Sequence, residues 1–147
     1  MLNIDVIGRP SPQGSKKSIG NNRFIESSKY LPAWRSAVTD AALLAMADAE
    51  WITATGPVEL EITFYMPRPK TVPIAKRPEP ITPPDIDKLI RGVADALTIA
   101  GAYEDDAQIV KVIALKNYAD VRDPGAFITI RHAGISSQLA VEPSVFS

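Results

Sequence analysis

Four aspartates in one short stretch are the residues of this chain best suited to chemistry. Asp85 and Asp87 stand one residue apart, directly after a pair of prolines, and Asp105 and Asp106 are adjacent later in the same stretch. Carboxylates that lie close together repel one another unless a cation sits between them. The hard ions Mg²⁺ and Mn²⁺ prefer oxygen ligands. The pattern therefore predicts a site for Mg²⁺, with Mn²⁺ as a substitute.

The first aspartate pair needs a particular backbone to share one ion. On a regular helix, side chains two residues apart point about 200° from each other. Asp85 and Asp87 can meet only if Asp85 lies in an extended segment before the helix, which Pro83 and Pro84 favour. Asp87 would then lie in the first turn, where the helix dipole stabilises its charge.

A helix and the strand that follows it usually pack side by side, so we expect all four carboxylates to converge on one spot. Asp85, Asp87 and Asp106 are the predicted metal ligands, and Asp105 is an accessory group. Any one of these aspartates alone would more often be a helix N-cap or a turn residue. Their joint spacing favours the metal site.

The stretch 82–111 resembles the RusA family of Holliday-junction resolvases. The resemblance is carried by P-D-I-D-K-L-I-R, then D-A-L-T-I-A-G, then E-D-D-A-Q-I-V, in the order and spacing of the family pattern. A single D-x-D is weak evidence, whereas the combined string is specific. The chain departs from the pattern at Lys88, where the family usually has asparagine, and at Arg91, where it usually has a functional lysine.

The two departures leave alternatives open. Arg91 lies one turn after Asp87 and is expected to hold a phosphate as a planar fork, or else to form an i, i+4 salt bridge. Lys88 is expected either to contact DNA or to be a solvated helix residue. Asp95, a further turn along, is expected to be a structural partner of Arg91 or Lys88.

The resemblance implies a Mg²⁺-dependent endodeoxyribonuclease that resolves Holliday junctions by paired symmetric nicks in DNA recombination and repair. It also implies a homodimer on four-way or branched DNA, no organic cofactor, and frequent occurrence in bacteriophages and prophages. A non-catalytic branched-DNA-binding protein from the same family is the alternative. A metal-dependent phosphohydrolase for small substrates is a third reading, which would not need dispersed basic loops.

The charge pattern is compatible with nucleic-acid binding although the net charge is −1. Residues 9–35 hold six basic residues against one acidic residue, and residues 66–91 hold six against three. Bound Mg²⁺ would further reverse the sign at the carboxylates. Solvated loops are the plainer explanation of such runs. The predicted DNA-binding residues are Lys16, Lys17, Arg68, Lys70, Lys76, Arg77, Lys88 and Arg91.

The elements that must position these residues follow from periodicity. Strands are predicted over 2–7, 58–64, 108–118 and 126–131, with a short arm at 23–26, and helices over 30–51 and 85–100. Residues 67–84 are rich in proline and should be extended, as either a functional arm or a disordered insertion. The expected fold is α+β, a mixed sheet with two main helices on one face. We expect one nuclease domain over 1–132 and a tail over 133–147.

Composition excludes several other functions. The chain has no cysteine and one histidine, His132, so thiolate zinc sites, disulfides and cysteine nucleophiles are excluded. No signal peptide is recognisable, and no apolar stretch approaches the roughly 20 residues that span a bilayer, so a cytoplasmic protein is expected. Trp34 and Trp51 have the spacing of core residues rather than of a base-stacking surface.

Overall fold

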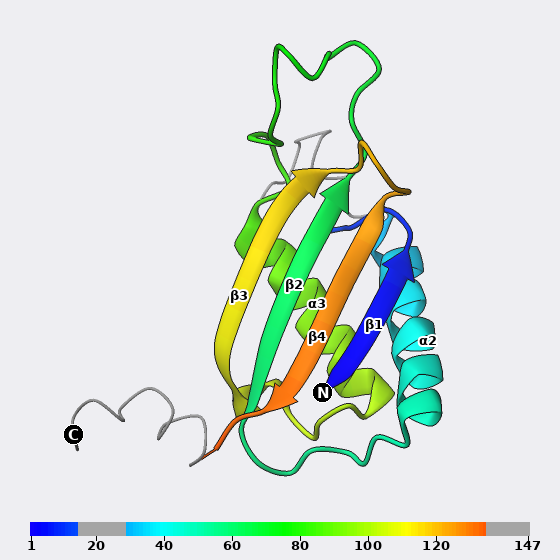
Figure 1. Ribbon diagram of the computed structural model, residues 1–147, viewed down its shortest axis with the longest axis vertical. Coiled ribbons are helices and arrows are strands. Elements are labelled where there is room, and N and C mark those ends of the chain that lie inside the picture. The colour runs from blue at the N-terminus through cyan, green and yellow to red at the C-terminus, as the bar shows by residue number, and fades with distance from the viewer. Residues whose placement is uncertain (15–28, 135–147) are drawn as a thin grey trace, which may run out of the picture.

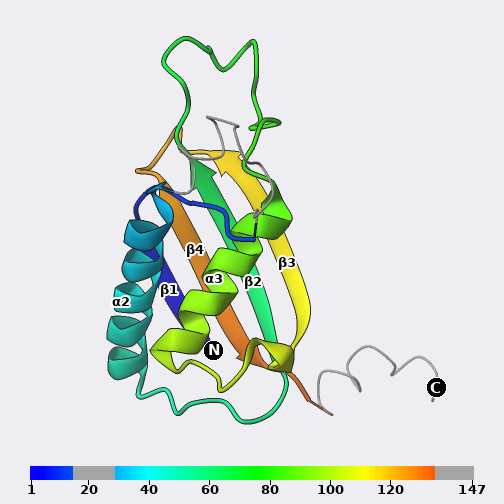
Figure 2. The ribbon, with the colours of Figure 1, turned by 180° about the vertical axis from the view of Figure 1, so that it is seen from behind.

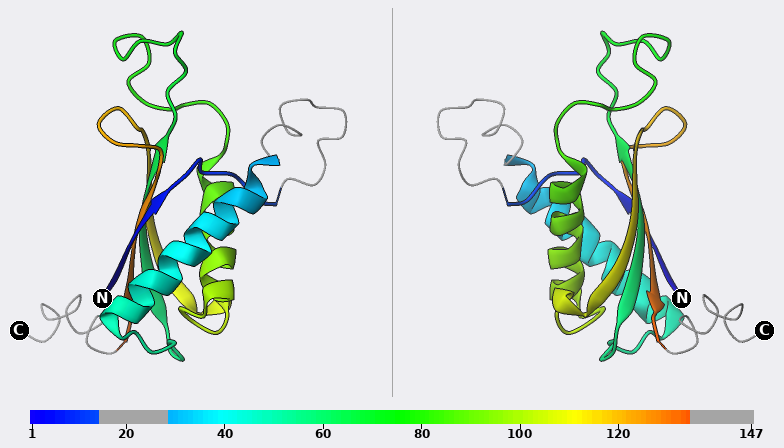
Figure 3. Two further views of the ribbon diagram at one scale, coloured as in Figure 1. Left: turned by 90° about the vertical axis from the view of Figure 1, so that its right-hand side faces the viewer. Right: turned by 90° about the vertical axis from the view of Figure 1, so that its left-hand side faces the viewer.

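The computed structural model describes residues 1–14 and 29–134 and has the predicted α+β architecture. The sheet has four strands, drawn as arrows in Figure 1, and Figure 3 shows both long helices on one of its faces. In chain order the elements are β1 (Leu2–Ile7), α2 (Leu31–Ala49), β2 (Val58–Met66), α3 (Ile86–Ala100), the 3₁₀ turn η1 (Asp106–Gln108), β3 (Ile109–Tyr118) and β4 (Gly125–His132).

The strands are ordered β1-β4-β2-β3, so β1 and β3 are the two edges. β4 pairs antiparallel with both β1 and β2, whereas β2 and β3 are parallel. Parallel neighbours require a crossover, and α3 supplies it. The mixed sheet therefore contains one β-α-β unit, and this unit carries all four aspartates.

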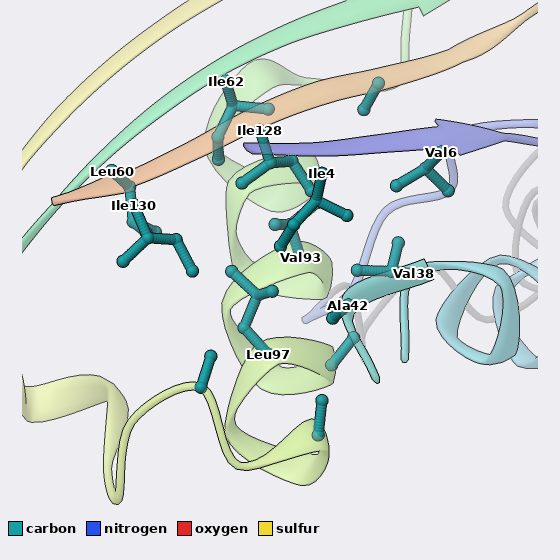
Figure 4. Packing of buried hydrophobic residues seen from close by; sticks show 14 of the residues in the cluster. Ile4, Val6, Val38, Ala42, Leu60, Ile62, Val93, Leu97, Ile128 and Ile130 are labelled. Carbon is teal, nitrogen blue, oxygen red and sulfur yellow. The ribbon is translucent and has the colours of Figure 1, made fainter. Parts of the chain in front are cut away.

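The core lies between the sheet and the helices. β2 alternates strictly between buried and half-buried residues, and its apolar residues face α2 and α3. Figure 4 shows Ile4, Ile62 and Ile128 of three strands near Val93 and Leu97 of α3. Burying each such side chain contributes roughly 1.5–3 kcal/mol, so the hydrophobic periodicity fixes which face of each strand meets the helices.

The crossover also sets the direction of α3. The Nζ of Lys116 donates to the carbonyl oxygen of Pro84 at 2.8 Å, which ties the end of β3 to the start of α3. At the other end of the sheet, the backbone N–H of Ala54 donates to Ala102 O at 3.1 Å, just before β2 begins and just after α3 ends. The helix thus runs opposite to β2 and β3, as Figure 2 shows from behind.

Most sequence predictions agree with the observed elements to within a few residues. The proposed arm at 23–26 and nearly all of the tail at 133–147 lie outside the described residues. Trp34 is buried, as predicted. Trp51 is half-buried, donates from Nε1 to Ala102 O at 3.0 Å and stacks on His132 at 4.7 Å between ring centroids. No helix in the described part of the chain has the length and apolarity to cross a membrane.

Candidate active site at the start of helix α3

Asp85 and Asp87 have the backbone that a shared site requires. Asp85 is the N-cap residue of α3 with φ −69° and ψ 142°, an extended conformation, and its side chain makes no capping hydrogen bond. Asp87 lies in the first turn of the helix, and both residues are exposed. The prediction that Asp85 precedes the helix is confirmed. Its carboxylate is not used as a cap, so it is available to a ligand.

Lys116 positions the backbone that leads to Asp85, a role that was not predicted from the sequence. Its register partner on β2 is Phe64, so it lies on the helix-facing side of the sheet. Its Nζ donates to Thr82 O at 3.0 Å and to Pro84 O at 2.8 Å. A lysine at a helix-facing position of a predicted strand is the signal that could have revealed it. Lys116 holds the chain in place immediately before Asp85.

The basic residues of the first turns of α3 have different surroundings. Lys88 lies 3.5 Å from the carboxylate of Asp85, an exposed i, i+3 pair. Arg91 is exposed and forms none of the ion pairs found within the described ranges. A Cβ on Gly14, at φ 103°, would come within 2.8 Å of Nη1 of Arg91, so the N-terminal segment passes close to this guanidinium.

Asp95 does not have the predicted partner. Its carboxylate accepts a hydrogen bond from Nε2 of Gln13 rather than pairing with Arg91 or Lys88. The reason is that residues 8–14 cross α3 here: Gln13 N also donates to Lys88 O at 3.1 Å, and a Cβ on Gly92 would lie 3.1 Å from Ser11 O. Asp95 therefore anchors the N-terminal segment on α3.

The expected convergence of all four carboxylates within one chain is wrong. Asp105 and Asp106 follow the far end of α3, next to the start of β3. The 15-residue helix α3 is about 22 Å long, and this length separates them from Asp85 and Asp87. A helix and its next strand do pack side by side, but antiparallel, so their junction lies at the opposite end from the helix start. Within residues 1–14 and 29–134, no three acidic or histidine side chains are grouped closely enough to hold a metal ion.

Asp105 and Asp106 form a coupled pair at this distant turn. Asp105 caps η1: its side chain accepts from the Ala107 N–H at 2.9 Å, and its own N–H donates to Oε1 of Gln108 at 2.8 Å. The Ala107 N–H, followed by the contact with Asp106, lowers the pKa of Asp105. The neighbouring Asp105 in turn raises the pKa of Asp106 above its usual value. Asp105 is thus a structural cap, and Asp106 keeps an exposed carboxyl group whose contact is with Asp105.

Arg68 organises the proline-rich segment rather than presenting a free cation. Its guanidinium binds Asp120 at 2.8 Å and donates to Arg77 O at 2.7 Å. It also lies over the Tyr118 ring, 4.0 Å from the centroid. The hydrogen bond to Asp120 raises the pKa of Arg68 and lowers that of Asp120. The segment 67–84 is therefore a positioned arm, drawn at the end of the sheet in Figure 1.

The remaining predicted DNA contacts divide into two groups. Lys70 and Lys76 are exposed on the arm, whereas Arg77 is half-buried and donates to the hydroxyl of Tyr118 at 3.4 Å. Lys16 and Lys17 lie outside the described residues.

Arg9, which was not predicted as a site residue, lies 4.2 Å from the Tyr30 ring centroid and lines a cavity of about 150 Å³. Prolines of the arm, Thr82 and Tyr118 complete much of the lining, so the cavity lies beside the entry to Asp85.

The chain is similar in sequence to known proteins. Residues 7–131 match the family profile described as Endodeoxyribonuclease RusA. The chain is also 31% identical over 144 residues to a Bacillus subtilis (strain 168) protein named Uncharacterized protein YqaN, with 88% of this chain and 95% of that protein covered. The family match runs from the last residue of β1 into β4 and covers every helix and strand between them. The chain therefore belongs to the RusA endodeoxyribonuclease family.

Proposed function

We propose that this protein is a Mg²⁺-dependent, structure-selective endonuclease that resolves Holliday junctions at the start of α3. The observation that carries the proposal is the pair of exposed, uncapped carboxylates of Asp85 and Asp87 at a helix N-terminus. On sheets with parallel strands, ligands usually bind beyond the carboxyl ends of those strands. The start of α3 lies at that end of β2 and β3. Membership of an endodeoxyribonuclease family supplies the reaction class.

The donor set fits a hard divalent cation. Mg²⁺ is commonly held by one or two carboxylates together with substrate phosphates and water, and Asp85 and Asp87 supply two. When bound, the ion would activate water and neutralise charge on the reacting phosphate. Neither aspartate is engaged by a backbone cap, so binding would not disrupt the helix start.

Basic side chains near the aspartates would place the phosphate. Arg91 is one turn beyond Asp87 and is exposed, so its planar fork can grip two phosphate oxygens. The dipole of α3 favours an anion at the same place. Lys116 acts on the backbone before Asp85 and is a positioning residue. Lys70 and Lys76 on the arm would contact the DNA backbone farther from the cut.

Lys88 supports the alternative function, a branched-DNA-binding protein that does not cut. Its ammonium group lies 3.5 Å from the Asp85 carboxylate and supplies a positive charge near the proposed cation position. The side chains of Lys88 and Asp85 are 37% and 60% exposed, so the ion pair is weak and a divalent ion can displace it. We therefore favour the catalytic proposal. Replacing Lys88, which removes its ion pair with Asp85, distinguishes the two functions.

The test is a labelled synthetic four-way junction incubated with the protein, with and without Mg²⁺. We expect paired symmetric nicks only with the metal. We expect Asp87→Asn to bind the junction normally but to cut it more than about 100-fold more slowly, since even groups that merely support a metal ligand cost 10–100-fold when lost. Asp48→Asn, an exposed aspartate of α2, is the matched control. The alternative would be established if the wild-type protein bound the junction tightly without cutting it in Mg²⁺ or Mn²⁺, and if Lys88→Asn restored cleavage.

A further inference from the structure

The cavity beside the start of α3 has walls built mainly from proline. It lies where the arm, the N-terminal segment and the last residues of β2 and β3 meet, and six of its ten lining residues are prolines. Proline has no backbone N–H and no polar side-chain atom. Met66 and the ring of Tyr118 add further apolar surface. Walls of this kind suit a flat, largely apolar ring better than a hydrated ion.

Contacts on two sides hold the cavity open. On the arm side, the guanidinium of Arg68 lies over the Tyr118 ring, 4.0 Å from its centroid. On the side of α3, the Nζ of Lys116 donates to the carbonyl oxygens of Thr82 at 3.0 Å and Pro84 at 2.8 Å. Because these contacts exist before any ligand binds, a ligand that fits the cavity would not have to order its walls.

The size of the cavity restricts what can enter it. Its volume of about 150 Å³ is that of a cavity that accepts one benzene ring. Pockets for drug-sized molecules are larger, roughly 300–1,000 Å³. The cavity therefore has room for a single six-membered ring, the size on which a pyrimidine base is built, and none for a base pair.

The charge at the cavity points to nucleic acid. Arg9 is the one charged residue among the described residues that line it, and its guanidinium is held over the Tyr30 ring. A guanidinium donates hydrogen bonds and accepts none, whereas bases carry acceptor atoms on their edges. Its positive charge also favours a ligand attached to a phosphate backbone. An apolar slot with a cation at its wall thus complements a base that is still part of a DNA strand.

We propose that this cavity receives one unstacked base of single-ring size from the nucleotide next to the cut phosphate. Thr82, Pro83 and Pro84 line the cavity and directly precede Asp85, so the cavity adjoins the proposed metal site. The inference rests on the proposed function, which places the phosphate there. Taking a base out of a stack costs least where it is already unpaired or unstacked. Base capture would therefore favour a branch point over continuous duplex.

Filling the cavity tests the inference. Thr82→Phe puts a ring in the cavity and keeps the carbonyl bond to Lys116, since only the side chain changes. Thr71→Phe, an equally exposed threonine of the arm outside the cavity lining, is the matched control. Without divalent metal, Thr82→Phe should bind a four-way junction about 10-fold more weakly, in the range expected for losing one stacked base. Its affinity for duplex, and both affinities of Thr71→Phe, should be unchanged.

Junctions with one abasic nucleotide identify the captured base. The abasic nucleotide is placed at each position around the branch point in turn. At one position the wild-type protein and Thr82→Phe should bind equally, because no base is left to exclude, and at the other positions the 10-fold difference should remain. A difference that persists at every position, or equal binding of the two proteins to the intact junction, overturns the inference.

Arg9→Gln beside Lys29→Gln provides a second test that leaves the cavity volume open. Both cations lie over the Tyr30 ring, at 4.2 and 5.2 Å from its centroid, but only Arg9 lines the cavity. Arg9→Gln should weaken junction binding, and this loss should vanish at the same abasic position as for Thr82→Phe. Lys29→Gln should affect all junctions alike. A loss in Arg9→Gln that is equal on every abasic junction would mean a phosphate contact and overturn the role of Arg9 in base capture.

These binding measurements separate the cavity from the proposed function. If the abasic pattern is found but the wild-type protein cuts no junction in Mg²⁺ or Mn²⁺, the proposed function fails and base capture stands. If the wild-type protein cuts the junction and Thr82→Phe binds and cuts it equally well, base capture fails and the proposed function stands.

Discussion

At the scale of single residues, the candidate site depends on which polar groups are already engaged. Asp105 and Arg68 looked like functional residues in the sequence, yet their charges are used for a cap and for an arm anchor. Asp85, Asp87, Arg91 and Asp106 are exposed. Of these, only Asp85 forms an ion pair among the described residues, and that pair is weak. The distinction between engaged and uncommitted groups identifies the residues most able to bind a ligand.

Arg91 is the residue whose role is most directly testable. We expect Arg91→Gln to lower the cleavage rate by roughly 100-fold, the usual loss when one donor to a reacting oxyanion is removed. Arg91→Lys should restore part of the rate, because it keeps the charge but not the fork. Single-turnover cleavage measures the rate, and a gel-shift titration checks that junction affinity changes much less. Equal losses in both variants and in affinity would instead indicate a purely binding role.

At the scale of elements, one glycine decides whether β1 can pair. A Cβ on Gly125 would stand 1.8 Å from Val6 O, a backbone atom that cannot move without breaking the β1–β4 ladder. Gly125→Ala should therefore reduce the free energy of unfolding by about 3 kcal/mol or more, the upper range for overpacking. Urea denaturation measures this change. Gly56→Ala, where nothing lies within 4 Å, is the control and should be nearly neutral.

The proline-rich arm is an element that Arg68 anchors. Arg68→Ala removes its bonds to Asp120 and to the arm carbonyls together, so trypsin should cut after Lys70 and Lys76 severalfold faster than in the wild type. The pKa of Asp120 is lowered by Arg68, so the anchor is intact near neutral pH and is lost only as pH falls through that lowered value. Asp123→Asn, a neighbouring exposed aspartate, should leave the cleavage rate unchanged. An unchanged rate in Arg68→Ala would show that Arg68 does not anchor the arm.

At the scale of the whole molecule, the cations are unevenly distributed although the net charge is −1. Most of the basic residues described above lie at the end of the sheet where α3 begins. Junction binding should therefore weaken steeply with salt, because each phosphate contact releases condensed counterions. The local charge at this end of the molecule, rather than the net charge of the chain, should therefore determine the affinity for the junction.

Removing two cations of the arm tests that distribution. Lys70→Gln combined with Lys76→Gln should reduce the slope of log affinity against log salt by about 1–2, roughly one per lost phosphate contact. Fluorescence anisotropy at several salt concentrations measures the slope. Arg131→Gln, which breaks an exposed pair with Glu61 on the other face of the sheet, should leave the slope unchanged. Equal changes in both proteins would indicate a general charge effect.

The sequence by itself determined the elements, the fold class and the family. Alternation in β2 and the helical spacing of α3 reflect local burial, which periodicity encodes directly. Asp85 likewise has the extended backbone that was predicted for the residue before the helix. These features depend on neighbours along the chain and were predicted correctly.

Only the tertiary structure decided which polar side chains are already engaged. The partners of Asp95 and Arg68, and the role of Lys116, could not be predicted, because each is set by segments far apart in the chain that packing brings together. The separation of Asp106 from Asp85 and Asp87 is different, because it follows from the length of α3 alone, and the predicted helix over 85–100 already implied it.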